Sequence, residues 1–185
     1  MGRGAGGDGG NVAAVTNPRV RVGVLGCGNV GAALVNTIAE QGSSIAERTG
    51  IDLEVTRVAV RSTSRDRGVD LAPEVFTTDA GSVVGASDVD VVVEVIGGLE
   101  PARELILEAL KAGKPVLTAN KELLANHGAE LYAAADEAGV DLLFEAAVAG
   151  GIPLMRPLRE SLVGEPIQRV MGIVNGTTNY ILTKM

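Results

Sequence analysis

The chain has 185 residues, a length typical of one domain or slightly more. Hydrophobic residues make up 46% of it but aromatic residues only 2%, so the core must consist of Val, Leu, Ile and Ala, as in a parallel α/β sheet. The net charge of −7 argues against nucleic acid or an anionic membrane surface as the main partner. One cysteine excludes an internal disulfide and favours the cytoplasm, and no apolar run approaches the roughly 18 residues of a membrane span.

Strands and helices are expected to alternate from residue 19 to about residue 150. This order predicts an α/β fold, a doubly wound parallel sheet of the Rossmann type. Residues 1–18 lack both a hydrophobic pattern and the apolar region of a signal peptide, and are expected to be a disordered tail. The expected strands are Val20–Leu25, Leu53–Val60, Val75–Thr77, Val89–Ile96, Pro115–Thr118 and Val140–Phe144. The expected helices are Asn29–Arg48, Asp79–Val84, Pro101–Ala112 and Glu122–Ala138, with an interruption near Gly128 left open.

The pattern changes after residue 150. A helix is expected over Leu154–Leu162, a strand over Ile167–Val174, a turn over Asn175–Asn179, and a last helix over Thr177–Met185 with Asn175 as its cap. Because the sequence stops inside this last helix without a stop signal, residues 151–185 are expected to be a linker and the start of a second, truncated α+β domain.

The sequence Gly26-Cys-Gly-Asn-Val-Gly31 follows the first expected strand and opens the first helix. This is the G-x-G-x-x-G pattern of dinucleotide-binding sites. Gly26 permits the tight turn, Gly28 lets the backbone approach a pyrophosphate, and Gly31 lets the helix pack closely on its strand. The N–H groups at the helix N-terminus favour phosphate. The competing interpretation is a glycine-rich turn without a ligand.

The end of the second strand bears on the choice of cofactor. Asp52 and Glu54 lie at the wrong end of that strand to bind the ribose 2′-hydroxyl of NAD. Arg61, with Arg65 and Arg67 nearby, is instead suited to a 2′-phosphate. The pattern therefore favours NADP over NAD, and a solvated basic loop is the alternative.

Other strand ends carry further candidates. The fourth strand ends in Glu94-Val-Ile-Gly-Gly98, where small residues let a nicotinamide ribose lie against the backbone, unless they form only a tight turn before the Pro101 helix. Lys121 follows the fifth strand and is suited to touch nicotinamide or substrate, or else is solvated. Glu145 follows the sixth strand, and as a partly buried carboxylate it needs a lysine, backbone N–H donors or a hard cation. Spacing alone leaves these three open.

The two remaining reactive side chains are expected to have ordinary roles. Cys27 lies near a helix N-terminus that would lower its pKa, but a small spacer side chain is the favoured interpretation. His127, the single histidine, is expected on a helix surface, which disfavours a catalytic histidine or a histidine-based metal site.

Five segments together resemble the homoserine dehydrogenase family. They are Gly26–Gly31, Val93–Gly98, Pro115–Lys121, Phe144–Pro153 and Asn175–Ile181, and the resemblance covers residues 19–185. The resemblance implies NAD(P)-dependent interconversion of L-homoserine and L-aspartate 4-semialdehyde, for threonine, methionine and isoleucine biosynthesis in the cytoplasm. It also implies a homo-oligomer for the full-length protein.

Carried over from the family, specific residues take roles. Gly26, Gly28, Asn29, Val30 and Gly31 would bind the pyrophosphate side of the cofactor. Ile96, Gly97 and Thr118 would line the nicotinamide side, with Lys121 close to nicotinamide and substrate. The resemblance also implies a monovalent cation, usually sodium, at Glu145, Val148, Gly150 and Ile152.

The family's substrate-binding acidic residues and its proposed proton donor correspond to positions after Met185. The chain as given is therefore expected to bind cofactor without turnover. Two alternatives remain: another amino-acid dehydrogenase, such as aspartate-semialdehyde or aspartate dehydrogenase, and a non-catalytic NAD(P)-sensing module. A catalytic cysteine after the sheet would support aspartate-semialdehyde dehydrogenase, and none is present.

Overall fold

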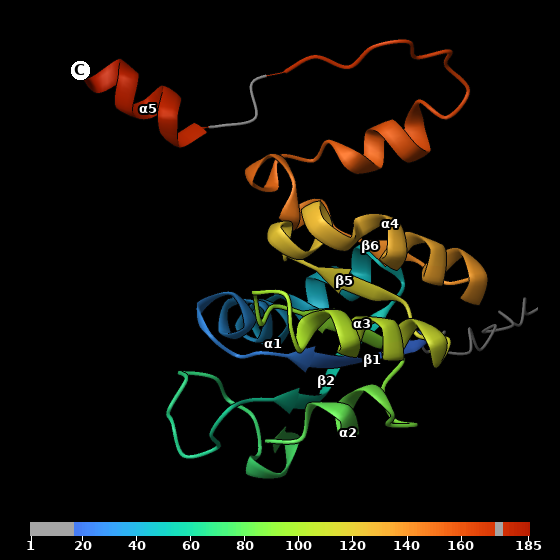
Figure 1. Ribbon diagram of the computed structural model, residues 1–185. Helices are drawn as coiled ribbons and strands as arrows, with labels where there is room; N and C mark the ends of the chain where they lie inside the picture. Colours follow the sequence, from blue (N-terminus) through green and yellow to red (C-terminus); the bar gives the residue numbers. More distant parts are fainter. Residues whose placement is uncertain (1–16, 173–175) are drawn as a thin grey trace, which may run out of the picture.

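The computed structural model describes residues 17–172 and 176–185, and its strands form one six-stranded sheet (Figure 1). All the strand pairs are parallel, in the order β3-β2-β1-β4-β5-β6. The strands are β1 Arg19–Leu25, β2 Asp52–Ala59, β3 Phe76–Thr77, β4 Val91–Glu94, β5 Val116–Thr118 and β6 Leu142–Leu143. The order reverses between β1 and β4, which confirms the predicted doubly wound sheet and places a ligand crevice at the carboxyl ends of these two strands.

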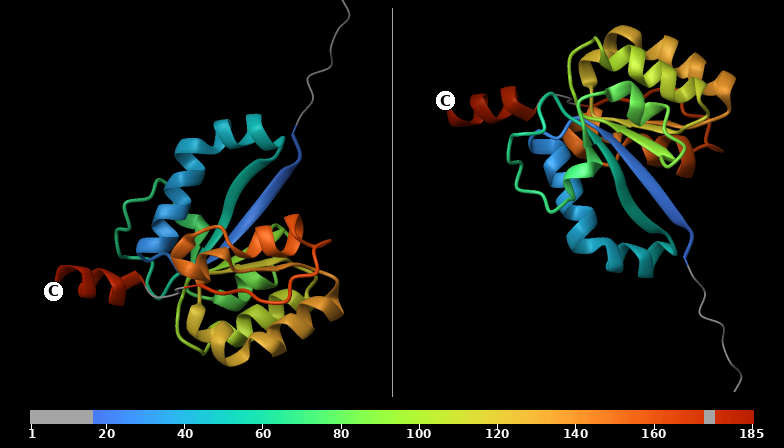
Figure 2. Two further views of the ribbon diagram at one scale, coloured as in Figure 1. Left: turned by 90° about the horizontal axis from the view of Figure 1, so that it is seen from above. Right: turned by 90° about the horizontal axis from the view of Figure 1, so that it is seen from below.

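Helices cover the sheet on both faces. The helices of the sheet region are α1 Asn29–Thr49, α2 Ala80–Val84, α3 Ala102–Lys111 and α4 Lys121–Ala138, and a single 3₁₀ turn, η1 Pro73–Val75, precedes β3. Figure 2 shows α1 on one side of the strands and α3 and α4 on the other. Side chains of β4 alternate between the two layers: Val92 belongs to the larger core cluster with α2, α3 and α4, whereas Val91 and Val93 face the cluster under α1.

Local sequence signals set the ends of α1 and α4. Gly50 and Gly139 end α1 and α4 in the left-handed conformation, with φ of 70° and 66°. The Asn120 side chain caps α4 by accepting the N–H of Leu123 at 3.1 Å. Helix α4 continues through Gly128, so the interruption considered there is absent.

β4 is shorter than the β-branched run suggested. It covers Val91–Glu94 instead of residues 89–96, although the Val95 N–H still donates to the Leu25 carbonyl at 2.9 Å. Beyond Val95 the N–H groups of Ile96 and Gly97 turn to the Glu94 carboxylate, at 2.7 and 3.1 Å. A side chain thus replaces the neighbouring strand as hydrogen-bond partner, and the backbone leaves the sheet there.

The segment after β6 departs most from the prediction. Two 3₁₀ turns, η2 Glu145–Ala147 and η3 Ala149–Gly151, lead to a π-helical stretch, η4 Pro157–Ser161, where an ordinary helix was expected. The predicted strand over 167–174 is wrong for the described residues 167–172, because no strand lies there for them to pair with. Helix α5, Gly176–Lys184, already includes most of the expected turn, and Asn175 lies outside the described residues.

The last helix of the chain and the apolarity of the helices in general complete the description of the fold. Helix α5 lies apart from the sheet (Figures 1 and 2), and its Tyr180, Ile181 and Leu182 side chains are exposed. None of the helices in the described part of the chain combines the length and apolarity needed to cross a membrane.

Candidate cofactor-binding site

The glycine loop between β1 and α1 contains two glycines that the protein itself requires. A Cβ on Gly31 would lie 2.2 Å from the Gly26 carbonyl oxygen, and a Cβ on Gly26 would lie 2.9 Å from the Val95 carbonyl oxygen. Gly26 also has a φ of +100°, which side chains rarely adopt. At Gly28, by contrast, a Cβ would meet nothing within 4 Å. Its lack of a side chain therefore leaves space in front of the α1 N-terminus, where the free N–H groups point.

A cleft of about 730 Å³ joins this loop to the end of β2. Its lining includes Gly26 and Gly28 on one side and Arg61 and Arg65 on the other. Arg67 also lines it, but the Arg67 guanidinium is held by the carbonyl oxygens of Ser62 and Arg65, both at 2.5 Å. Arg61 is exposed and borders the space at the carboxyl end of β2. The fold thus brings Arg61 to the same cleft as the glycine loop.

A second cleft, of about 850 Å³, extends the crevice toward β5 and β6. Val30 and Thr118 lie in its wall together with Glu145. Both clefts include Val95, at the end of β4, so they flank the point where the strand order reverses. Ile96 and Gly97 line the first cleft, and Lys121 lies outside the lining of both, as an exposed residue at the start of α4.

Glu94 is the residue that the sequence interpretation missed. Its side chain is completely buried at the end of β4. The carboxylate accepts the N–H groups of Ile96 and Gly97 on Oε1, and the Thr118 hydroxyl on Oε2 at 2.6 Å. The available signal was an acidic residue at the end of an otherwise apolar strand, since a buried carboxylate requires such partners.

Backbone N–H groups are hydrogen-bond donors to the Glu145 carboxylate. They are one of the three kinds of partner that the sequence left open for it, beside a lysine and a hard cation. Its Oε1 accepts the N–H groups of Leu154 and Met155, and its Oε2 accepts that of Arg156 at 2.9 Å. Burial acts to raise the pKa of Glu145, but these backbone donors outweigh it and hold the pKa below its usual value. The carboxylate therefore anchors the start of the 154–161 segment next to the second cleft.

The loop that carries the other expected cation ligands folds back close to Glu145. Ala149 and Gly150 have φ of 53° and 66°, which turn the chain between Val148 and Ile152. Within the described residues, no group of three or more His, Cys, Asp or Glu side chains is arranged to hold a metal ion. A cation here would accordingly rely on one carboxylate and on backbone oxygens.

Cys27 and His127 have the ordinary roles that were favoured. The Cys27 thiol packs in the core cluster under α1, and burial raises its pKa, an effect that the positive charge of Arg67 offsets only in part. The expected lowering by the helix N-terminus is therefore wrong, since desolvation dominates. His127 lies on α4, with Nδ1 3.6 Å from a carboxylate oxygen of Glu130.

Sequence models of two domains match the chain. The model described as "Homoserine dehydrogenase, NAD binding domain" matches residues 26–145, and the one described as "Homoserine dehydrogenase" matches residues 153–185. Homoserine dehydrogenase of Corynebacterium glutamicum is 56% identical over 167 residues, which are 90% of this chain and 37% of the relative. The Bacillus subtilis enzyme is 48% identical over 166 residues, 90% of this chain and 38% of the relative. The chain thus spans little more than a third of these relatives.

Solved structures of similar proteins have the same fold. A homoserine dehydrogenase from Thiobacillus denitrificans is 44% identical, with a TM-score of 0.77, over 90% of this chain and 38% of that one. A hyperthermophilic archaeal homoserine dehydrogenase in complex with NADPH is 31% identical, with a TM-score of 0.72, over 90% of this chain and 56% of that one.

Proposed function

Because the chain belongs to the homoserine dehydrogenase family, we propose that it forms the NADP(H)-binding part of an enzyme that interconverts L-homoserine and L-aspartate 4-semialdehyde. The observation that carries this proposal is the glycine loop, with open space at Gly28, in one cleft with Arg61. A nicotinamide cofactor is supported both by the NAD-binding family match and by a relative solved with NADPH.

The two clefts suggest how the cofactor lies. We place its pyrophosphate on residues 26–31, where the α1 N-terminus supplies N–H donors and a partial positive charge. Arg61 would bind the adenosine 2′-phosphate, because a guanidinium pairs well with phosphate oxygens. Val30, Ile96, Gly97 and Thr118 would surround the nicotinamide end, where the clefts meet.

The cofactor, when bound, supplies hydride exchange at the nicotinamide ring. The residues of this chain would bind it, orient it and exclude water from one side. By analogy with the family, Lys121, the first residue of α4, would lie near the reacting end. Because the chain spans 37% of the Corynebacterium relative, we assign cofactor binding to this chain and turnover to the longer protein.

We propose a monovalent cation, with sodium favoured, as a second component. The donors suit it, because hard cations prefer carboxylate and carbonyl oxygens. Glu145 Oε2 accepts one backbone N–H and retains a lone pair, and the carbonyls of Val148, Gly150 and Ile152 lie on the loop turned by Ala149 and Gly150. Their role would be to fix the loop beside the second cleft. The cytoplasm as location and a homo-oligomer for the full-length protein are further proposals that follow from family membership.

A titration of the chain with NADPH, followed by nicotinamide fluorescence, tests the assignment. We expect saturable binding with NADPH bound more tightly than NADH. In a longer chain that includes the region matching the relatives' remaining length, we expect homoserine-dependent reduction of NADP⁺. Failure of the folded chain to bind either reduced cofactor would contradict the proposal.

A further inference from the structure

Glu94 occupies an unusual position, as a fully buried carboxylate beneath the crevice. The ion pairs of the described residues do not include it, so hydrogen bonds alone compensate for its burial. Two of its three donors are the backbone N–H groups of Ile96 and Gly97, at 2.7 and 3.1 Å. The side chain therefore determines the path of the loop that lines the first cleft.

The third donor connects this loop to β5. The Thr118 hydroxyl donates to Glu94 Oε2 at 2.6 Å, and the Thr118 Oγ1 in turn accepts the Asn120 N–H at 3.0 Å. Asn120 returns to the first loop, because its Nδ2 donates to the Gly98 carbonyl at 2.6 Å. A closed ring of hydrogen bonds thus joins the ends of β4 and β5.

The ring also determines where α4 begins. The Asn120 Oδ1 accepts the Leu123 N–H and caps the helix, so Lys121 is its first residue. Neither loop can shift without breaking bonds to buried groups, and such groups are costly to leave without partners. The Ile96–Gly97 loop and the Lys121 end of α4 are therefore held in one relative arrangement by Glu94 and Thr118.

We propose that Glu94 is a positioning residue for the nicotinamide end of the cofactor. It acts through the backbone of Ile96 and Gly97 and through Thr118, and it has no part in binding the adenosine end at Arg61. This inference rests on the proposed function, in that it takes nicotinamide to lie against these loops. The inference thus adds to the proposed site a residue that affects binding of the nicotinamide half of the cofactor and leaves binding of the adenosine half unchanged.

The test compares NADPH with 2′-phospho-ADP-ribose, which lacks nicotinamide. Glu94→Ala removes all three bonds, and we expect its affinity for NADPH to fall at least about tenfold while 2′-phospho-ADP-ribose binds within about threefold of wild type. The control is Glu122→Ala, which removes an exposed carboxylate from the first turn of α4 and should leave both affinities unchanged. Equal losses for the two ligands in a folded Glu94→Ala protein, or no loss for either, would overturn the inference.

Two conservative variants keep the test decisive if Glu94→Ala does not fold. Gln at position 94 retains an oxygen for the Ile96 and Gly97 N–H groups and presents an amide N–H to the Thr118 oxygen. Asp retains the charge but is one methylene too short to reach both loops. We expect Glu94→Gln to bind NADPH within about threefold of wild type and Glu94→Asp to bind it about tenfold more weakly.

The opposite order would show that charge, and not loop position, matters, and would overturn the inference. Amide hydrogen exchange at Ile96 and Gly97 provides a second readout, which should be faster in Glu94→Asp than in Glu94→Gln. If wild type binds neither ligand, the proposed function fails, and that result is distinct from the failure of Glu94.

Discussion

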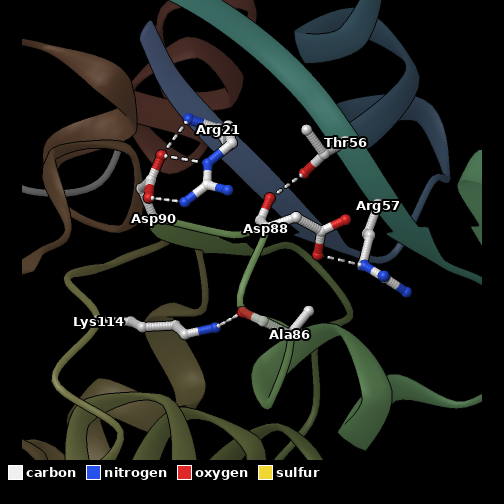
Figure 3. Close-up of polar contacts among 7 residues, drawn as sticks. All are labelled: Arg21, Thr56, Arg57, Ala86, Asp88, Asp90 and Lys114. Carbon is white, nitrogen blue, oxygen red and sulfur yellow. Dashed lines mark hydrogen bonds and ion pairs between the residues drawn. The ribbon is translucent and has the colours of Figure 1, made fainter. Parts of the chain in front are cut away.

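Arg21 of β1 binds Asp90, the residue before β4, toward the amino-terminal ends of these two central strands (Figure 3). The guanidinium donates to both carboxylate oxygens, from Nε at 2.9 Å and from an Nη at 2.6 Å, and the Arg21 backbone N–H adds a third bond at 2.8 Å. These bonds join two strands that are 69 residues apart in the sequence. They lower the pKa of Asp90 from 3.8 to about 2.

Asp90 should make the free energy of unfolding depend on pH in the acid range. Because its pKa is lower in the folded chain than in the unfolded one, its contribution is complete above pH 3.8 and is lost as the pH falls toward about 2. Both side chains are more than a third exposed, so we expect Asp90→Asn to lower Tm near neutral pH by only about 1–4 °C. Urea unfolding at several pH values should show the difference between wild type and variant shrinking below pH 3.8.

The matched control for Asp90 is Asp70→Asn, an exposed carboxylate outside the ion pairs of the described residues. The free energy of unfolding of Asp70→Asn should differ little from that of wild type near neutral pH. A difference for Asp90→Asn that stays constant down to pH 2 would contradict the coupling to Arg21.

The three glycines of the loop should separate folding from binding. In Gly31→Ala the new methyl group would meet the Gly26 carbonyl at 2.2 Å, so both Tm and NADPH affinity should fall. In Gly28→Ala it meets no protein atom within 4 Å, so Tm should be retained while NADPH binds at least about tenfold more weakly. Gly42→Ala, in α1 and also without a neighbour within 4 Å, is the control and should be slightly more stable with normal binding. Normal NADPH binding by Gly28→Ala would show that the pyrophosphate lies elsewhere.

Arg61→Ala should change the choice of cofactor. Loss of a charge-assisted bond to phosphate is expected to weaken NADPH about 10–100-fold and to leave NADH unchanged. Arg48→Ala removes the same charge from the last turn of α1, the end of the helix remote from the glycine loop, and should affect neither cofactor. The NADP preference would be refuted by parallel effects of Arg61→Ala on NADPH and NADH, measured by fluorescence titration.

The cation proposal predicts a specific response to sodium. The Tm of the wild-type chain should be higher in sodium chloride than in choline chloride of equal ionic strength, by roughly 2–4 °C. Glu145→Gln keeps an oxygen for the Leu154 and Met155 N–H groups but loses the charge and the acceptor of the Arg156 N–H. With two of its three bonds retained, the segment should still fold while the sodium response disappears. Glu145→Ala should lose both the fold of the 154–161 segment and the sodium response, because three N–H groups lose their acceptor. An unchanged response in Glu145→Gln would exclude the carboxylate as a ligand.

Features carried by neighbouring residues were the ones that the sequence predicted well. The glycine turn between β1 and α1 depends on a few consecutive positions and lies where it was predicted, and α4 ends at Ala138 as predicted. The strand expected at 167–174 is absent from its described part, residues 167–172, because β-branched residues favour a strand only where another strand offers hydrogen bonds. The shortened β4 has a related cause, since Glu94 competes with the sheet for two N–H groups.

The amino-acid sequence by itself determined the alternation of strands and helices and the position of the glycine loop, because these follow from hydrophobic periodicity and backbone sterics within each segment. Only the tertiary structure decided which residues face one another across the crevice. It placed Arg61 in the cleft of the glycine loop, satisfied Glu145 with backbone N–H groups, and joined Glu94 to Thr118 over 24 residues of sequence. Hydrogen bonds between strand ends depend on how the strands are ordered in the sheet, and spacing along the chain does not contain that information.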